Sequence, residues 1–257
     1  MTATGQILAQ IAAEAGAVVM RHYRDGAQTR LKADRSPVTD ADEEAERLIL
    51  SRLAAAFAGV PVVAEEEAAA GRTVQTGRHF FLVDPLDGTR EFLSRNGEFT
   101  VNIAEVIDGV PRAGVVYAPA VARLFYGDAR GAFELALEPG HDADFTQARP
   151  LAARTPSADG LVAVGSRSHG DAATDEFLKS FSISQFTSAG SSLKFCLVAA
   201  GEADIYARGG RTMEWDTAAG HAVLAAAGGS VKNWDGTPFL YGKPGFENPA
   251  FVARGLV

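Results

Sequence analysis

The hexapeptide DPLDGT at residues 84–89 contains the residue types of a metal site. Asp84 and Asp87 are three residues apart and follow an apolar run that predicts a buried strand ending in a turn. Two carboxylates at the end of a strand can converge on a hard divalent cation such as Mg²⁺, which prefers oxygen ligands. The carbonyl oxygen of Leu86, between them, is a further candidate ligand. The spacing therefore predicts a magnesium site on this turn.

The end of the same hexapeptide has the features of an anion site. Gly88 and Thr89 stand where a helix could start, so their backbone N–H groups could hold a phosphate. A simpler interpretation is also available. Asp-Pro and Asp-Gly are ordinary turn dipeptides, and Asp87 could serve only as a helix cap. The hexapeptide alone does not decide between these interpretations.

Three further acidic positions stand at the predicted ends of helices or strands, where ligands are often placed: Asp42, Glu65 and Asp216. Each also has a structural alternative. Asp216 could be a helix N-cap, and Asp42 could form a capping-box-like pair with Thr39. Glu65 begins a run of three glutamates that could be a solvated turn. Their occurrence together with DPLDGT favours one shared metal site.

The segments that must position these residues begin with two helices and a sheet. Apolar residues at helical spacing predict a helix over residues 5–24 and a second one that ends near residue 59. A short strand over 62–64 leads into the glutamates. After the hexapeptide, alternating or continuous apolar runs predict antiparallel strands over 99–107, 115–118, 124–126 and 133–137.

The second half of the chain alternates strands and helices. We expect strands over 161–165, 183–187 and 203–207, and helices over 191–200 and 216–227. Residues 138–160 are rich in Pro, Asp and Ala and are the best candidate boundary. The predicted fold class is α/β with stacked layers, divided into an N-terminal lobe (1–145) and a C-terminal lobe (146–257).

Composition restricts the possible functions. The 257-residue chain is 47% hydrophobic with a formal net charge of −8, which argues against general binding to nucleic acid backbones. Cys196 is the single cysteine and lies in an apolar stretch, so we expect a buried side chain and a reducing compartment, the cytoplasm. We expect no signal peptide and no membrane span. Peripheral association with a membrane, and the choice between a monomer and a homodimer, stay open.

At this point the chain resembles a known family, the inositol monophosphatase superfamily of Mg²⁺-dependent, Li⁺-sensitive phosphatases that includes fructose-1,6-bisphosphatase. Residues 84–89 match its D-P-[IL]-D-G-T pattern, residues 215–220 (WDTAAG) its W-D-x-A-A-G pattern, and residues 36–42 (SPVTDAD) its N-terminal motif. The resemblance runs from about residue 5 to the C-terminus. It implies a layered α+β sandwich in the order αβαβα.

Within the family, the chain is most similar to the bacterial 3′(2′),5′-bisphosphate nucleotidases. The segments that carry this similarity are residues 90–92, 95–103, 165–169, 190–196 and 203–208. The implied reaction is hydrolysis of the 3′-phosphate of adenosine 3′,5′-bisphosphate to AMP and phosphate. The sulfated precursor of that nucleotide, a 5′-phosphosulfate, would be a second substrate.

The resemblance also implies residue roles. The metal ligands would be Glu65, Asp84, the Leu86 carbonyl, Asp87 and Asp216, with Glu66 as the alternative to Glu65. Asp42 and Thr89 would orient and activate the attacking water, and with the ligand Glu65 they make up the implied catalytic residues. Gly88 and Thr89 would hold phosphate. The nucleotide contacts would be His169, Ser191, Lys194 and Arg208.

Three of the nucleotide contacts can also be considered from their residue types alone. Lys194 on a mostly apolar helix favours a phosphate-facing role, although a side chain that reaches to solvent is the alternative. Arg208 ends a predicted strand and suits a bidentate phosphate contact. A lone histidine such as His169 is often a structural polar residue, and its Ser-Arg-Ser-His context favours the nucleotide.

The implied mechanism uses two or three Mg²⁺ ions and a water molecule, with no phospho-enzyme. Metal ions lower the pKa of a bound water and stabilise the leaving oxygen, and Li⁺ would inhibit by occupying one ion's site.

Three other functions are alternatives to this one. A haloacid-dehalogenase-type phosphatase needs two aspartates two residues apart, whereas here the spacing is three with a proline between them. An inositol monophosphatase or a sugar bisphosphatase of the same superfamily is the main alternative. An inactive metal- or nucleotide-binding regulator would have lost a ligand, whereas every expected side-chain ligand position here has an acidic residue.

Overall fold

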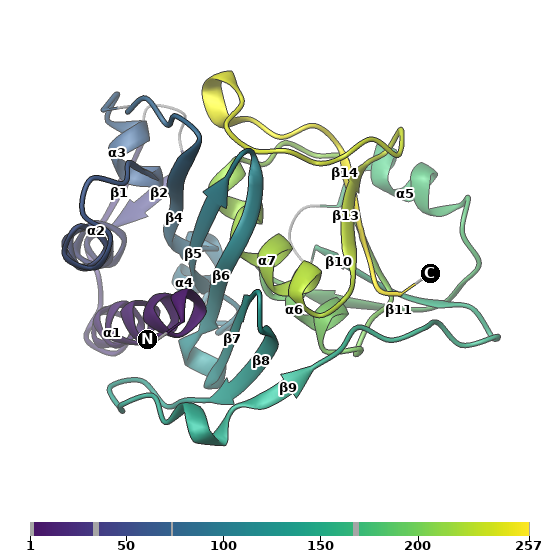
Figure 1. The fold of residues 1–257 in the computed structure, drawn as a ribbon, viewed down its shortest axis with the longest axis horizontal. Coiled ribbons are helices and arrows are strands. Elements are labelled where there is room, and N and C mark those ends of the chain that lie inside the picture. Colours follow the sequence, from purple (N-terminus) through teal and green to yellow (C-terminus); the bar gives the residue numbers. More distant parts are fainter. Residues whose placement is uncertain (1–2, 33–35, 73, 167–169, 257) are drawn as a thin grey trace.

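Five layers of helix and sheet alternate through the molecule (Figure 1), in a computed structural model that describes residues 3–32, 36–72, 74–166 and 170–256. Helices α1 (Thr4–Asp25) and α2 (Asp40–Ala56) form the first layer and cover one face of a seven-stranded sheet. Helices α6 (Leu193–Ala199) and α7 (Glu214–Ala226) pack on its other face. A five-stranded sheet follows, and α5 (Ala172–Leu178) lies on its outer side. The predicted αβαβα order is confirmed.

The first sheet has the strand order β3-β4-β5-β6-β7-β8-β9. Its strands are β3 (Val62–Ala64), β4 (His79–Asp87), β5 (Thr100–Ile107), β6 (Val110–Ala118), β7 (Arg123–Asp128), β8 (Gly131–Ala136) and β9 (Arg149–Leu151). Only the β3–β4 pair is parallel, and the other neighbours are antiparallel. Short turns join β5 to β6, β6 to β7 and β7 to β8, as antiparallel pairing allows.

Strand β4 is apolar on both sides because it lies between two helical layers. Phe81 and Val83 point into the core under α1 and α2, whereas Phe80 and Leu82 point into the core around α6 and α7. Alternate side chains of a strand face opposite sides of the sheet, so a continuous apolar run is what a doubly covered strand needs. This explains why β4 has no polar alternation.

Helix α7 lies close to β6, and a glycine makes that approach possible. A Cβ atom at Gly114 would come within 2.8 Å of both the Ala219 carbonyl oxygen and the Ala222 Cβ. This contact sets the distance between the sheet and the helix that carries Asp216.

The second sheet has the order β11-β10-β12-β14-β13. Its strands are β10 (Leu161–Ser166), β11 (Ile183–Ala189), β12 (Ile205–Arg208), β13 (Ser230–Asn233) and β14 (Phe251–Arg254). Strands β10, β11 and β12 are parallel, so their C-terminal ends meet at one edge. Ligands of α/β sheets commonly bind at such an edge.

Most predicted elements are present with shifted ends, and several were missed. The predicted strand before the hexapeptide continues to Asp87 as part of β4, and the last predicted helix begins at Glu214. The hairpin of β1 (Thr29–Leu31) and β2 (Pro37–Thr39) was not predicted. Helices α3 (Glu65–Ala69) and α5 and strands β13 and β14 were also missed. Strand β9, which was not predicted either, lies within the predicted boundary segment.

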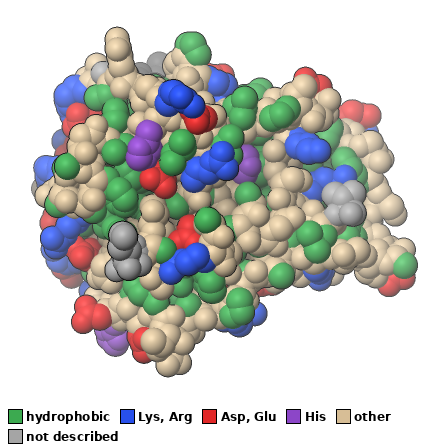
Figure 2. Space-filling view, in the orientation of Figure 1, with side chains coloured by type: hydrophobic (Ala, Val, Ile, Leu, Met, Phe, Trp, Pro, Cys, Tyr) green, Lys and Arg blue, Asp and Glu red, His purple; other side chains and the backbone are tan. Residues whose placement is uncertain are grey.

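Two expectations from composition can be compared with the structure. Cys196 is fully buried, as predicted. No helix in the described part of the chain is long and apolar enough to cross a membrane. On the face shown in Figure 2, Lys and Arg side chains are interspersed with Asp and Glu rather than gathered in one basic area.

Candidate metal and phosphate site

The hexapeptide forms an irregular end of β4 that turns into a short helix. Pairing with β5 shifts register between Asp84 and Asp87, and the Leu86 N–H donates to Asp84 Oδ1 at 3.0 Å. Gly88 then adopts a left-handed conformation with φ of 90° and precedes α4 (Thr89–Leu93). A left-handed residue at this position suits glycine, which has no Cβ. A Cβ at Gly88 would also meet Ser191 Oγ at 2.3 Å.

The structure brings four predicted carboxylates together from three segments: Glu65 from α3, Asp84 and Asp87 from β4, and Asp216 from α7. Burial raises the pKa of Asp84 and of Asp216 well above the ordinary value, and the other carboxylates of the group raise it further. Burial also raises the pKa of Asp87. A cation among these groups would relieve both effects, because it stabilises the ionised carboxylates. An all-oxygen donor set of this kind fits a hard divalent cation.

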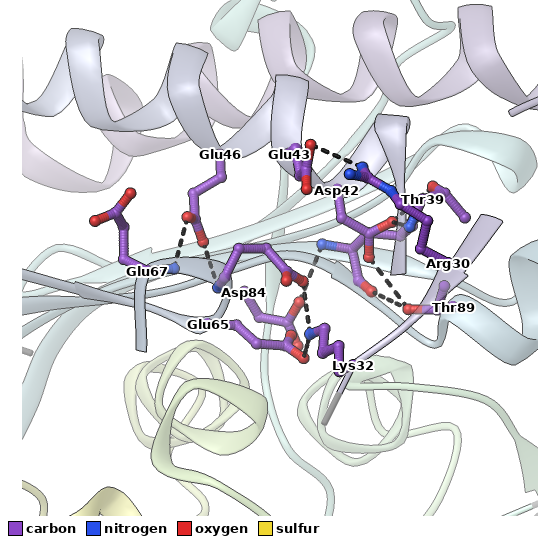
Figure 3. A network of polar contacts seen from close by, with 12 residues as sticks. Arg30, Lys32, Thr39, Asp42, Glu43, Glu46, Glu65, Glu67, Asp84 and Thr89 are labelled. Atoms are coloured by element: carbon purple, nitrogen blue, oxygen red, sulfur yellow. Dashed lines mark hydrogen bonds and ion pairs between the residues drawn. The ribbon is translucent and has the colours of Figure 1, made fainter. Parts of the chain in front are cut away.

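The carboxylates are not arranged as a finished coordination sphere. Within residues 3–32, 36–72, 74–166 and 170–256, no three His, Cys, Asp or Glu side chains are already placed to hold a metal ion. Lys32 instead supplies the positive charge at the edge of the group. Its Nζ lies 2.7 Å from Glu65 Oε1 and 2.7 Å from Glu66 Oε1 (Figure 3).

Asp42 is both a capping residue and a neighbour of Thr89. The backbone N–H and the hydroxyl of Thr39 donate to Asp42 Oδ2 at 2.8 and 2.6 Å, so the capping-box interpretation is confirmed. The other oxygen, Oδ1, accepts from Thr89 Oγ1 at 3.2 Å (Figure 3). Burial raises the pKa of Asp42 to about 6. The cap fixes the carboxylate, and its second oxygen remains available to orient Thr89.

Asp216 is the third residue of α7, so its interpretation as the N-cap is wrong. Met213 is the N-cap, and its N–H donates to Asp216 Oδ2 at 2.8 Å. Glu65 likewise does not end a strand: β3 ends at Ala64 and Glu65 begins α3. The solvated-turn interpretation of the three glutamates is therefore wrong as well.

A cavity of about 320 Å³ adjoins the carboxylates. Predicted site residues among its walls are Glu65, Asp87, Gly88, Thr89, Ser191, Lys194, Arg208 and Asp216. Lys194 and Arg208 therefore line the same cavity as these carboxylates, together with Arg90 and Arg211. A larger cavity of about 920 Å³ shares Glu65 and Asp216 with it.

Lys194 is almost completely buried in the wall of the smaller cavity. Its Nζ donates to the Ser191 carbonyl oxygen at 2.6 Å and lies 5.3 Å from the ring centre of Tyr206. Burial lowers the pKa of Lys194 to about 8. The alternative in which this side chain reaches out to solvent is therefore wrong. The ammonium group is held by backbone carbonyl oxygens in the cavity wall. Arg208 ends β12, as expected.

Of the two other predicted nucleotide contacts, Ser191 is among the residues that the structure describes and His169 is not. Ser191 Oγ lies 2.8 Å from the carbonyl oxygens of both Asp87 and Glu98, so its hydroxyl joins two backbone segments beside the cavity. His169 lies outside the described residues.

Three residues that support the carboxylates were missed. Ser192 Oγ lies 3.1 Å from Asp87 Oδ2 and 2.6 Å from the Asp216 carbonyl oxygen, and Asn102 Nδ2 donates to Ser192 at 3.0 Å. Glu46 accepts two backbone N–H groups of α3. The only sequence signal for Glu46 was an acidic residue one helical turn after Asp42, on the apolar side of the helix.

Comparison with known proteins identifies the family of the chain. The sequence model of the inositol monophosphatase family matches residues 3–254. The chain is 45% identical to the 3′(2′),5′-bisphosphate nucleotidase CysQ of Escherichia coli strain K12, over 94% of this chain and 96% of that protein. The crystal structure of CysQ from Bacteroides thetaiotaomicron, a bacterial member of the same family, superposes with a TM-score of 0.82. It is 35% identical, and the match covers 98% of this chain and 96% of that one.

A second solved structure is more distant. The inositol monophosphatase of Anabaena (Nostoc) sp. PCC 7120 has a TM-score of 0.73 and 28% identity, over 97% of this chain and 89% of that one. The family match, the relatives and the assembled carboxylates agree: the chain belongs to the inositol monophosphatase family.

Proposed function

We propose that this protein hydrolyses the 3′-phosphate of adenosine 3′,5′-bisphosphate to AMP and phosphate. The sulfated precursor, which carries a 5′-phosphosulfate, is proposed as a second substrate. Relatives named 3′(2′),5′-bisphosphate nucleotidase at 45% identity support this substrate. The structural observation that carries the proposal is the cavity that Lys194 and Arg208 line together with Glu65, Asp87 and Asp216. A substrate with two phosphate groups needs both a metal site and a separate cationic site.

The proposed cofactor is Mg²⁺, in two or three ions, with Li⁺ as an inhibitor that takes one ion's place. The ligands would be Glu65, Asp84, the Leu86 carbonyl, Asp87 and Asp216. Such ions lower the pKa of a bound water and offset charge on the phosphoryl oxygens. Glu65 would have to exchange Lys32 for a metal ion, because Lys32 now pairs with it.

Asp42 and Thr89 would hold the attacking water in line with the scissile bond. Thr89 Oγ1 donates a hydrogen bond to Asp42, so its lone pairs remain free to accept a hydrogen bond from water. This fixes the orientation of the water oxygen. The backbone N–H groups of Gly88 and Thr89 would bind phosphoryl oxygens, since the turn presents them to the cavity.

The remaining contacts would select the nucleotide. Lys194 and Arg208 would bind the 5′-phosphate, and His169 and Ser191 are proposed to lie beside the nucleoside. For Ser191 this is a contact in addition to its role between the Asp87 and Glu98 carbonyls. A charged hydrogen bond contributes about 1.5–3 kcal/mol, which is enough to distinguish a bisphosphate from a monophosphate.

The test is phosphate release in Mg²⁺ from adenosine 3′,5′-bisphosphate, inositol 1-phosphate and fructose 1,6-bisphosphate, each with and without Li⁺. We expect the highest kcat/KM for the nucleotide, and inhibition by Li⁺. A preference for inositol 1-phosphate or the sugar bisphosphate would support the alternative, an inositol monophosphatase or sugar bisphosphatase. It would refute the roles of Lys194 and Arg208 while leaving the metal site intact.

Other expectations stay predictions. These are the division into lobes 1–145 and 146–257, a cytoplasmic location, a monomer or homodimer, and no nucleic acid partner. Size-exclusion chromatography with light scattering measures the oligomeric state.

A further inference from the structure

A buried carboxylate outside the metal-ligand group holds the short helix that carries Glu65. Glu46 lies on α2 and its side chain is only 3% exposed. Its Oε2 accepts from the Glu66 N–H at 2.8 Å and its Oε1 accepts from the Glu67 N–H at 3.0 Å (Figure 3). Both oxygens of one side chain are therefore used on one backbone segment.

These two N–H groups are the ones that a helix cap ordinarily satisfies. Helix α3 begins at Glu65, so Glu66 and Glu67 are its second and third residues, and Ala64 at the N-cap has no side-chain acceptor. An N-cap side chain normally accepts from the N–H of the second or third residue. Glu46 does this from another helix, with both of its oxygens.

The short length of α3 makes this external cap necessary. The helix has five residues, and a helix of that length is not stable by itself because nucleation costs more than a few hydrogen bonds return. Glu65 points toward Asp84 from the first residue of this helix (Figure 3). The direction of its side chain therefore depends on what fixes the first turn, and the two bonds to Glu46 do so.

Burying another acid here is electrostatically unfavourable. The charges of Glu65 and Glu67 act against ionised Glu46. Repulsion of this kind is tolerated where the group makes bonds that a neutral side chain could not make equally well, because a carboxylate can accept two N–H bonds side by side. In glutamine an NH₂ donor replaces one of the two oxygens and would face a backbone N–H, so the pair of bonds could not be kept as it is.

We infer that Glu46 is a positioning residue for the metal ligand Glu65, acting through the first turn of α3. The inference rests on the proposed metal role of Glu65. Asp42 is on the same helix, one turn earlier, so α2 would align the residue that orients Thr89 and the helix that carries Glu65 as one rigid unit.

The experiment measures Mg²⁺ binding by calorimetry on the full-length protein without substrate, for the wild type, Glu46→Gln, Glu46→Asp and Glu46→Ala. Glu44→Gln is the matched control, because Glu44 is on the same helix but pairs with Arg21 and His22 away from the site. Supporting residues of metal ligands typically contribute about 10–100-fold in affinity. We expect Glu46→Gln to weaken Mg²⁺ binding about 10-fold, Glu46→Ala to weaken it more, and Glu44→Gln to leave it unchanged.

Kinetics and melting temperature separate positioning from a structural role. At saturating Mg²⁺, the Glu46→Gln enzyme should regain kcat to within about threefold, so the change appears in the Mg²⁺ concentration that gives half-maximal rate. A lower melting temperature in EDTA with an unchanged Mg²⁺ dissociation constant would overturn the inference. So would a wild type that binds no Mg²⁺. Failure of the nucleotide assay alone would leave the inference intact, because calorimetry needs no substrate.

Discussion

Replacing Thr89 by valine tests the proposed water-orienting pair most directly. Valine keeps the branched shape of threonine and removes only the hydroxyl, whose oxygen lies 3.2 Å from Asp42 Oδ1. The hydroxyl's other contact is weaker, with the Leu86 carbonyl at 3.4 Å. Loss of these bonds should therefore affect the fold little, whereas the attacking water would lose its acceptor.

The size of the expected effect follows from two contributions. A hydrogen bond to a charged group contributes about 1.5–3 kcal/mol, and about 1.36 kcal/mol corresponds to tenfold in rate. The bond alone thus accounts for roughly 10- to 150-fold. Assistance to proton transfer typically contributes about 10²–10⁴-fold. Because 3.2 Å is long for an O–H···O bond, we expect kcat to fall about 10²–10³-fold with little change in KM.

The assay is steady-state phosphate release from adenosine 3′,5′-bisphosphate at saturating Mg²⁺, with melting temperature as the check on folding. Thr89→Ser keeps the hydroxyl and should retain activity within about tenfold of the wild type. Asp42→Asn combined with Thr89→Val should be no slower than the slower single variant, because both would act on one water. A Thr89→Val enzyme with kcat within threefold of the wild type would refute the reasoning.

The remaining predictions concern metal removal, substrate binding and pH. EDTA should abolish activity. Mg²⁺ at 100 times its dissociation constant should raise the wild-type melting temperature by about 5–10 °C. Asp84→Asn should lose this increase, and an unchanged increase in the variant would contradict the ligand role of Asp84. Lys194→Met should raise KM for the nucleotide about 10- to 100-fold with a smaller change in kcat. An unchanged KM in the Lys194→Met enzyme would exclude the 5′-phosphate contact. Burial lowers the pKa of Lys194 to about 8, so the wild-type KM should also rise above pH 8 as Lys194 loses its charge. Burial lowers the pKa of His221 from 6.5 to about 4, so the unfolded chain binds a proton that the folded chain does not, and stability should fall as the pH drops from about 6.5 to 4. His221→Phe should flatten that decline in acid unfolding curves, and an unaltered slope would contradict the assignment.

The spacing of apolar residues predicted those helices and strands whose buried side chains follow the same spacing. Helix α1 and strand β3 were predicted to within one residue, because helical spacing and a short apolar run have clear periods. The β1–β2 hairpin was missed because β1 is exposed along its whole length and carries no apolar alternation. Helix α3 was missed because its first turn depends on Glu46, which is distant in sequence. An element stabilised from outside leaves little signal in its own residues.

The candidate residues of the site could be predicted from the sequence, whereas their assembly could not. Residue types and spacing alone made Asp84 and Asp87 candidate ligands and predicted the turn at Gly88, because a strand end, two carboxylates and a glycine are local features. Tertiary structure decided that Lys32 pairs with Glu65 and that Lys194 is buried in the cavity wall without reaching solvent. It also decided that α2 holds the helix of one proposed ligand while orienting Thr89. Such contacts join segments far apart in the chain, and their energies depend on burial and distance, which no linear pattern contains.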